Sequence, residues 1–386
     1  MADSPEKRKI AIVGSAYPLR GGGIATFNER MAKAFLENGH EVKIYTFSLQ
    51  YPSFLFPGKT QYSNEDPPEE LDIEVLVNSI NPFNWIKAGR YLKEQKPDLV
   101  ILRYWIPFMA PCLGTISKIV HKNKHTKVIA IADNVVPHEK KPGDKILSKY
   151  FVKNVDAFVT MSKSVLKDLG MFDSQKPRKY TPHPLYDNFG EIIPKEIAKK
   201  QLKLQDNINY VLFFGFIRDY KGLDILLEAF ANKELCKFPL KLLIAGEFYA
   251  KPDKYLEIIK KNQLEDLVEL RTEFIPNTEV HKYFCASDVV VQPYKSATQS
   301  GITQVAYHFN KPMITTNVGG LAELIPNEKV GYVVNTNAQE IADAICRFYD
   351  QGKEQEFSQN AREEKKKYSW EVFIKTIFEL DNELKR

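Results

Sequence analysis

Cysteine is scarce in this chain of 386 residues, which has only 4: Cys112, Cys236, Cys285 and Cys346. They form no CxxC pair and no short Cys/His spacing of the kind that holds zinc. This excludes a disulfide scaffold and a zinc ribbon, and it fits the reducing conditions of the cytosol. With 44% hydrophobic and 27% charged residues, the composition is typical of a packed globular protein.

Long apolar runs are missing as well. The N-terminal stretch passes from charged residues into a short apolar segment and has no small-residue cleavage site, so no secretory signal is expected. The least polar long window, residues 99–120, contains Arg103, Pro107, Pro111 and Lys118. It favours a buried strand followed by a loop over a membrane-spanning helix.

Several motifs of well-known sites do not occur in the sequence. There is no GxGxxG, no GxxxxGK[ST] and no GxSxG, which excludes the usual dinucleotide site, the phosphate-binding P-loop and the hydrolase elbow. There is also no HExxH, no Asp-x-Asp and no other cluster with metal-ligand spacing. No metal site is therefore expected.

The positive charge of the chain, +5 in all, lies in its N-terminal half. Residues 1–190 hold 27 Lys and Arg against 20 Asp and Glu, whereas the remainder holds 27 against 29. A basic half suits an anionic membrane surface or an anionic substrate, although such an asymmetry can also have no function. Nucleic-acid binding is not expected, because the excess is modest and no platform of basic and aromatic residues occurs.

Short apolar runs alternate with amphipathic stretches, which is the pattern of repeated βα units with parallel sheets. The length exceeds the usual limit of a single core, about 250–300 residues. A Pro-rich stretch near residues 185–195 predicts a hinge between two such series. We expect an α/β protein with two Rossmann-like domains facing each other across a cleft, residues 1–188 and 189–365, and a final helical segment, 366–386. The predicted strands are 9–13, 41–46, 98–102, 127–132 and 157–160, then 210–215, 240–245, 268–271, 288–293, 312–316 and 330–334.

Ligands of such sheets bind beyond the carboxyl ends of the strands, so the loops after strands are the place to look. The first loop, residues 14–23, ends in three glycines, among them Gly22 and Gly23, at a helix start. Missing Cβ atoms let a ligand approach the backbone, and free N–H groups favour an anion. A tight turn is the alternative, but it does not need three glycines.

Two cations follow the first strand of the second domain. Gly215, Arg218 and Lys221 lie in the string GFIRDYKG. A guanidinium matches two phosphate oxygens and an ammonium adds a compact charge, so the pair could hold a diphosphate and neutralise it as it leaves. The alternative is an ordinary solvated basic loop.

Later loops of the second domain offer further hydrogen-bonding groups. The string SATQSG predicts a phosphate or sugar cradle at a helix start, or simply an N-cap, and NVGGLAE adds two glycines and a carboxylate. The candidate residues are Thr298, Gln299, Ser300, Gly301 and Glu323.

Two histidines stand out. His138 closely follows the predicted strand 127–132 and could face the cleft, whereas His183 lies between two prolines at the linker. A lone histidine is more often structural than functional, and that alternative stays open for both.

In these features the sequence resembles the retaining glycosyltransferases of family 4, which have the two-domain GT-B fold and transfer a sugar from a nucleotide-diphosphate sugar. The resemblance covers nearly the whole chain. It rests on the order and spacing of several segments, each weak alone: the glycines 21–23, GFIRDYKGLDILLEAF, LLIAGE, SDVVVQPY, KPMITTNVGGLAE and YSW.

The resemblance implies roles for individual residues. Arg218 and Lys221 match the pair that binds the donor diphosphate, and Gly22 and Gly23 match glycines whose backbone approaches the phosphates. It implies retention of the anomeric configuration by electrostatic stabilisation of the departing diphosphate. It also implies a final helix that packs back on the N-terminal domain. The nucleotide sugar would be a substrate, so no resident cofactor is expected, and the absence of Asp-x-Asp disfavours a metal-dependent transferase. His138 is a candidate sugar contact.

One departure concerns two glutamates that the family usually has, separated by seven residues. Ala297 and Val305 stand in their places, and Thr298, Gln299 or Gln304 could supply hydrogen bonds instead. This leaves open a sugar-nucleotide epimerase or phosphorylase on the same fold, and a non-catalytic binding protein.

The leading hypothesis is a cytoplasmic glycosyltransferase of polysaccharide biosynthesis. The second domain would hold the nucleotide sugar and the first a glycan or lipid-linked acceptor. The basic N-terminal half and the loop YWIPFM, residues 104–109, permit peripheral contact with the inner face of a membrane.

Overall fold

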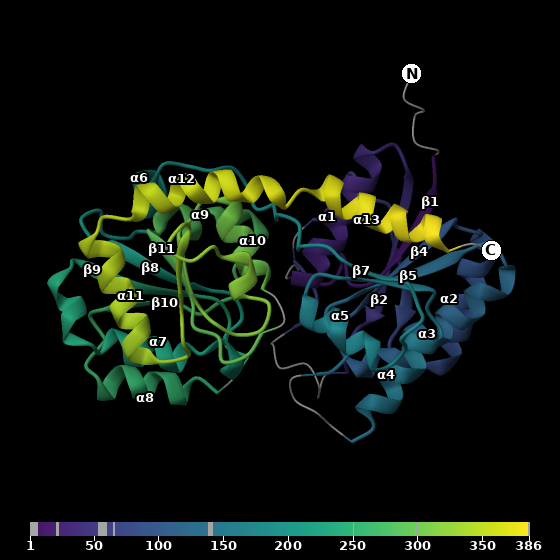
Figure 1. The fold of residues 1–386 in the computed structure, drawn as a ribbon, viewed down its shortest axis with the longest axis horizontal. Helices are drawn as coiled ribbons and strands as arrows, with labels where there is room; N and C mark the ends of the chain where they lie inside the picture. The colour runs from purple at the N-terminus through teal and green to yellow at the C-terminus, as the bar shows by residue number, and fades with distance from the viewer. Residues whose placement is uncertain are drawn as a thin grey trace. The chain divides into compact units, whose positions relative to one another are not determined.

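The computed structural model describes residues 7–20, 23–52, 60–64, 66–137, 142–249, 251–297 and 300–384. The chain divides into two compact units, Met1–Pro184 with Ser369–Arg386, and Leu185–Tyr368. The chain thus changes unit at 184/185 and 368/369, where the sequence predicts boundaries at 188/189 and 365/366. Figure 1 shows each unit as a sheet between helices.

The first unit is built on a seven-stranded sheet in the order β3-β2-β1-β4-β5-β6-β7, with every neighbouring pair parallel. The strand order reverses between β1 and β4, and ligands of such sheets bind at this switch point. The strands are β1 (Lys9–Val13), β2 (Glu41–Leu49), β3 (Ile73–Asn78), β4 (Leu99–Tyr104), β5 (Lys127–Ala132), β6 (Ala157–Thr160) and β7 (Arg178–Tyr180).

The helices of the first unit cover both sides of that sheet. Helices α1 (Gly23–Glu37) and α13 (Trp370–Glu383) lie on one side, and α2 (Pro82–Gln95), α3 (Ala110–Val120) and α4 (Asp144–Lys153) on the other, with α5 (Lys163–Gly170) before β7 (Figure 1). In α1 the side chains of Phe27, Met31 and Phe35 are buried, as the helical spacing predicts.

The last helix packs on α1. The rings of Trp370 and Phe373 lie 5.0 and 5.4 Å from that of Phe27, and Lys127 pairs with Asp381 at 2.9 Å. These contacts hold residues 369–384 in the first unit.

The second unit has six parallel strands in the order β10-β9-β8-β11-β12-β13, with the switch point between β8 and β11. The strands are β8 (Asn209–Phe214), β9 (Leu240–Ala245), β10 (Val268–Arg271), β11 (Val289–Gln292), β12 (Met313–Thr316) and β13 (Gly331–Val334). The helices are α6 (Lys195–Gln201), α7 (Leu223–Phe230), α8 (Asp253–Lys261), α9 (Val280–Ala286), α10 (Gly301–His308), α11 (Ala338–Asp350) and α12 (Glu354–Glu364).

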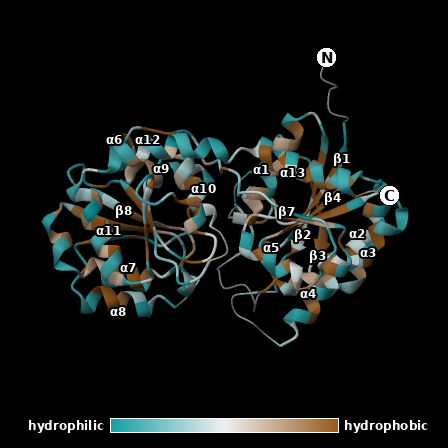
Figure 2. Ribbon diagram, viewed as in Figure 1, coloured by the Kyte–Doolittle hydropathy of each residue, from teal (hydrophilic) through white to brown (hydrophobic). Residues whose placement is uncertain are grey.

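Each unit has its own hydrophobic core around its sheet, and Figure 2 shows the hydrophobic residues concentrated in the strands. All six residues of β4 are buried, as in strands covered by helices on both sides. Burying a large apolar side chain such as Phe213 stabilises the fold by about 1.5–3 kcal/mol.

The apolar window 99–120 differs in one respect from its prediction. It forms β4, a short 3-10 turn (Pro107–Met109) and helix α3, rather than a strand and a loop, because Pro111 lies in the first turn of α3, where a missing N–H costs nothing. In the part of the chain that the structure describes, no helix is long and apolar enough to span a membrane.

Candidate active site

The loop after β8 lies against the end of β11 at the switch point of the second sheet. Gly222 has a φ of +70°, and a Cβ there would stand 1.9 Å from the carbonyl oxygen of Pro293. Only glycine fits this approach. The backbone N–H of Lys295 also donates to the backbone carbonyl oxygen of Tyr220 at 2.7 Å. The loop after β8 is therefore hydrogen-bonded to the segment that follows β11.

The ammonium of Lys221 lies inside this junction. Gly215, directly after β8, has a φ of +97°, and a Cβ on it would be 2.9 Å from the Lys221 Nζ and 3.4 Å from the Ile302 Cδ1 of α10. The structure therefore brings Gly215, Lys221 and the first turn of α10 together, as the position of their loops predicts.

Burial strongly perturbs Lys221. Burial is the larger cause and the positive charge of Arg218 the smaller, and together they lower the pKa of the ammonium to about 7. An anion bound beside Lys221 would offset both effects, because it favours the charged form.

Arg218 is exposed, in contrast to Lys221. Its guanidinium carbon lies 5.2 Å from the centre of the Tyr249 ring, which in turn stacks on Phe216 at 4.3 Å. The backbone N–H of Ile217 donates to the backbone carbonyl oxygen of Glu247 at 2.8 Å, which joins this loop to the one after β9. Arg218 thus stands on an aromatic support, and its N–H groups make no hydrogen bond to the residues that the structure describes.

The other charges of the region are paired with one another. The Asp224 carboxylate accepts from Lys295 at 2.8 Å and from Lys254 at 2.7 Å. Among the described residues no carboxylate pairs with Arg218 or Lys221. These two cations are therefore available to an anion.

Ser300 and Gly301, at the start of α10, have structural roles. The Ser300 hydroxyl accepts from the Ile302 N–H at 3.2 Å and lies 3.1 Å from the Tyr294 hydroxyl. A Cβ on Gly301 would be 2.8 Å from the Tyr186 ring, which explains why glycine stands there. Ser300 is thus an N-cap, and the role of both residues as a ligand cradle stays a prediction.

The positions of the missing glutamates are apolar in structure as well as in sequence. Ala297 joins a small cluster with Tyr294 and Leu321, and Val305 is buried in α10. Between them Gln304 is fully buried, and neither atom of its amide has a hydrogen-bond partner within the described ranges. Such a group is costly unless something supplies its partners.

Several predicted residues are placed at the expected edge or are not described. Glu323 is exposed in the 3-10 turn Ala322–Leu324 after β12, on the edge that carries the other loops. Gly23 opens α1 after β1. His138, Gly22, Thr298 and Gln299 lie outside the described residues.

His183 is part of the core. It is 2% exposed, its Nδ1 donates to the Pro184 oxygen at 2.7 Å, and its ring meets Phe27 edge-on at 5.1 Å. Burial lowers its pKa to about 3, so it is neutral at physiological pH. His183 is therefore a structural residue of the core, which is one of the two alternatives that the sequence left open.

Sequence reasoning missed a buried ion pair at the switch point of the first sheet. The Arg103 Nε and Nη2 donate to the two Asp133 oxygens at 2.6 and 2.7 Å, and the guanidinium covers the Phe27 ring at 4.0 Å. The signal was present, since a charged residue near the end of apolar strand β4 faces the opposite charge directly after neighbouring β5.

The loop after β4 does not offer the free apolar surface that its sequence suggests. Pro107 and Met109 are buried, and Trp105 packs on the core and donates from Nε1 to the Tyr51 hydroxyl at 2.6 Å. Of the residues that the structure describes, no three His, Cys, Asp or Glu side chains gather as metal ligands.

Solved structures with this architecture define the class of the fold. The chain is similar to the Anabaena protein HepE in complex with UDP and glucose, with a TM-score of 0.74, 16% identity and coverage of 97% of this chain and 100% of that one. It is also similar to sucrose-phosphate synthase from Thermosynechococcus elongatus, with a TM-score of 0.73, 18% identity and coverage of 98% and 99%. The fold is GT-B, as predicted.

Sequence comparisons then identify the family. Residues 21–178 match the model described as Glycosyltransferase Family 4, and residues 194–364 match Glycosyl transferases group 1. The O-antigen chain mannosyltransferase C of Escherichia coli is 24% identical over 355 residues, 89% of each chain. The D-inositol 3-phosphate glycosyltransferase of Segniliparus rotundus is 25% identical over 367 residues, 87% of this chain and 80% of that one. The chain belongs to the GT-B glycosyltransferases of group 1 and is a glycosyltransferase.

Proposed function

We propose that this glycosyltransferase moves a hexose from a nucleoside-diphosphate sugar to a glycan or lipid-linked acceptor, with retention of configuration. The observation that carries the proposal is the pair Arg218 and Lys221. They are two cations without a carboxylate partner among the described residues, on the loop at the switch point of the second sheet. A diphosphate is the ligand whose charge matches both.

In this mechanism the protein stabilises the leaving group. The bond between the anomeric carbon and the diphosphate oxygen breaks, and its electron pair stays on the diphosphate, where Arg218 and Lys221 neutralise the charge. The acceptor oxygen bonds to the anomeric carbon on the face that the diphosphate leaves. Its proton passes to a diphosphate oxygen. Neither a metal ion nor a resident cofactor takes part.

Relatives support the donor and acceptor classes. HepE is described in complex with UDP and with UDP-glucose, and an Escherichia coli relative is a mannosyltransferase of the O-antigen chain. We assign this chain to the cytoplasm, with peripheral contact between its basic N-terminal half and a membrane that carries the acceptor.

Donor binding is tested by thermal shift with a panel of nucleoside diphosphates and their sugars. A ligand at 100-fold its Kd raises the unfolding free energy by about 2.7 kcal/mol. We expect one nucleotide to stabilise the wild type and the matched control Lys260→Ala, an exposed cation of the same unit, but not Arg218→Ala. Stabilisation of Arg218→Ala as large as that of the wild type would refute the assigned site.

Ala297 and Val305 favour one alternative, a binding protein without turnover, because the family's two carboxylates are absent. Release of nucleoside diphosphate that depends on an added acceptor sugar supports the transferase. Conversion of the donor without an acceptor would indicate an epimerase. Donor binding with no turnover on any acceptor would leave the binding protein.

A further inference from the structure

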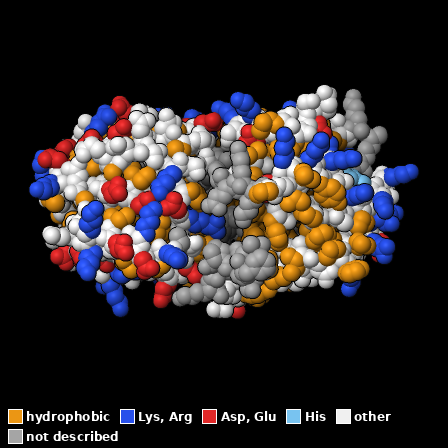
Figure 3. All heavy atoms as spheres, turned by 90° about the horizontal axis from the view of Figure 1, so that it is seen from below, with side chains coloured by type: hydrophobic (Ala, Val, Ile, Leu, Met, Phe, Trp, Pro, Cys, Tyr) orange, Lys and Arg blue, Asp and Glu red, His pale blue; other side chains and the backbone are white. Residues whose placement is uncertain are grey.

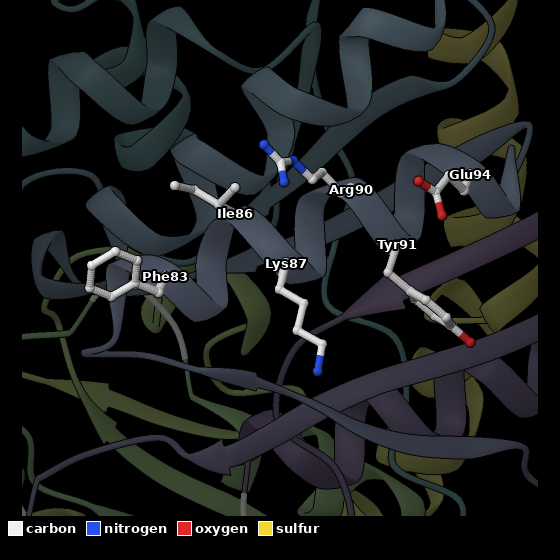
Figure 4. A pocket seen from close by; sticks show the side chains of 6 residues that line it. All are labelled: Phe83, Ile86, Lys87, Arg90, Tyr91 and Glu94. Atoms are coloured by element: carbon white, nitrogen blue, oxygen red, sulfur yellow. The ribbon is translucent and has the colours of Figure 1, made fainter.

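Helix α2 exposes apolar side chains at its start. Phe83 is 84% exposed and Ile86 is 39% exposed, and Ile80, just before the helix, is 46% exposed. The Asn81 side chain caps the helix by accepting from the N–H groups of Phe83 and Asn84, so Phe83 is held in the first turn. Figure 4 shows Phe83, Ile86 and the side chains of the next turns along one side of α2, which line a groove of about 540 Å³.

Cations follow the apolar residues on the same side. Lys87 and Arg90 are exposed, and within the described ranges neither makes an ion pair or a side-chain hydrogen bond. Elsewhere in the unit Lys43 and Lys179 are held in ion pairs. The positive charges of Lys87 and Arg90 are therefore not neutralised by a described carboxylate, unlike those of Lys43 and Lys179.

Neighbouring helices continue the same chemistry. Helix α2 packs on α3, and α3 packs on α4. Ile146, in the first turn of α4, is 75% exposed between Lys145 and Lys149. The three helices carry only two carboxylates against seven basic residues, Lys87, Arg90, Lys93, Lys118, Lys145, Lys149 and Lys153.

The apolar side chains lie toward the ligand-binding edge of the first sheet. Helices α2 and α4 follow β3 and β5, so their first turns stand near the carboxyl ends of those strands. Figure 3 shows hydrophobic side chains gathered on one face of the first unit, with Lys and Arg at its margin and few carboxylates. An acceptor presented at this face would enter at the edge where ligands of such sheets bind.

We propose that this face, formed by α2, α3 and α4, docks on an anionic lipid bilayer. Phe83, Ile86 and Ile146 insert among the headgroups, and the surrounding cations pair with lipid phosphates. This deepens the membrane contact of the proposed function and rests on it, because it names the surface that brings the chain to a lipid-linked acceptor. Unpaired cations around exposed apolar groups fit anionic headgroups by charge complementarity, which an uncharged surface would not satisfy.

Vesicle sedimentation with the full chain tests the proposal. The probes are vesicles of phosphatidylcholine alone and of phosphatidylcholine mixed equally with phosphatidylglycerol. We expect binding only to the mixed vesicles and loss of binding with added salt. Phe83→Ser should weaken it about tenfold, and Arg90→Glu by more than the roughly fivefold expected for neutralising one cation.

Matched controls lie on α13, on the other side of the same sheet. Val372 is 45% exposed and Lys375 is exposed without an ion pair among described side chains, so Val372→Ser and Lys375→Glu should bind like the wild type. Equal loss in these controls, equal binding to uncharged vesicles, or no binding at all would overturn the proposal.

Nucleotide-induced thermal shift, measured on the same variants, separates this surface from the donor site. Phe83→Ser and Arg90→Glu should keep the full shift, and Arg218→Ala should lose the shift while keeping vesicle binding. If no nucleotide shifts the Tm of the wild type while vesicle binding is kept, the donor site is rejected and the membrane surface is not. Binding of a nucleic acid or a protein by this face, with no vesicle binding, would reject the membrane surface alone.

Discussion

The guanidinium of Arg103 makes two hydrogen bonds to the carboxylate of Asp133, 2.6 and 2.7 Å long, with both side chains less than a tenth exposed. This pair joins β4 to the loop after β5 at the switch point of the first sheet. It also carries the cation that covers Phe27, the residue on which Trp370 and His183 pack.

Replacing Asp133 with Asn should therefore destabilise the first unit strongly. The change leaves a buried guanidinium without a counter-charge, which costs about 3–5 kcal/mol, or a Tm lower by about 10 °C. Asp381→Asn, which removes one partner of the pair with the less buried Lys127, should cost much less. Differential scanning calorimetry measures both, and equal losses would contradict this view of Arg103.

Binding of a nucleoside diphosphate should depend on pH through Lys221. Its pKa is about 7 in the free protein, and a bound anion raises it, so binding takes up a proton above that pH. We expect affinity to fall by up to about tenfold per pH unit above about pH 7. Titration calorimetry in buffers of different ionisation enthalpy shows the uptake. In Lys221→Met the proton uptake should vanish, and its persistence would assign it to another group.

The same group makes the apo protein more stable at higher pH. The folded pKa of Lys221, about 7, lies below the usual 10.5 of the unfolded chain. The unfolded state therefore binds more protons between these values, and the free energy of unfolding rises with pH across them. Lys221→Met should flatten this rise in denaturant titrations, and an unchanged slope would speak against a buried ammonium.

Gly222 should tolerate no side chain. A Cβ there would stand 1.9 Å from the Pro293 oxygen, whereas Gly352, also at positive φ, has open space around it. We expect Gly352→Ala to cost about 1 kcal/mol from backbone strain alone, and Gly222→Ala to cost several times more and to weaken nucleotide binding. Similar Tm values for the two variants would show that the loop can move away from β11.

Acid should destabilise the first unit through His183. Its pKa is about 3 when folded, against 6.5 unfolded, so the unfolded state binds the extra proton between these values. Stability is then lost as pH falls from about 6.5 toward 3, by up to about 1.4 kcal/mol per pH unit. His183→Asn should show a shallower decline in urea titrations, and a parallel one would assign the effect to carboxylates.

One substitution, Gln304→Met, distinguishes a structural role of the Gln304 amide from a role in ligand binding. Because neither amide atom has a described partner, Gln304→Met should leave the Tm unchanged or raise it. If the amide serves the donor, nucleotide affinity falls in a variant that is as stable as the wild type. A clear drop in Tm would show that the amide already has partners in the folded chain.

Alternation of apolar and amphipathic segments predicts most of the sheets, because a buried parallel strand is a short apolar run. It misses β3 and β7 for a reason seen in their residues. In β3 only Val77 is buried, and β7 is the three-residue segment Arg178–Tyr180 with no buried side chain. Both are edge strands, so one side of each lacks the packing that leaves a hydrophobic signal.

The location of the candidate site could be predicted, because it follows from the place of its residues in the order of strands. Arg218 and Lys221 follow a strand at the switch point, and the topology alone brings their loop to β11. Which of the two cations would be buried was not predictable, because the Lys221 Nζ lies 5.9 Å from the centre of the Tyr294 ring, and these residues are close only in the folded unit. The ion pair of Arg103 was missed because its partner lies 30 residues away, and joining the two charges requires that β4 and β5 be recognised as neighbouring strands.

The return of the chain at Ser369 has a consequence for synthesis. The second unit is an insertion whose ends meet, since the Leu185 N–H donates to the Tyr368 oxygen at 3.0 Å. On the ribosome, α13 emerges only after the whole of the second unit has been made. Until then the rings of Phe27 and Phe35 lack their covering helix, so the first unit begins to be made before the second and is completed after it.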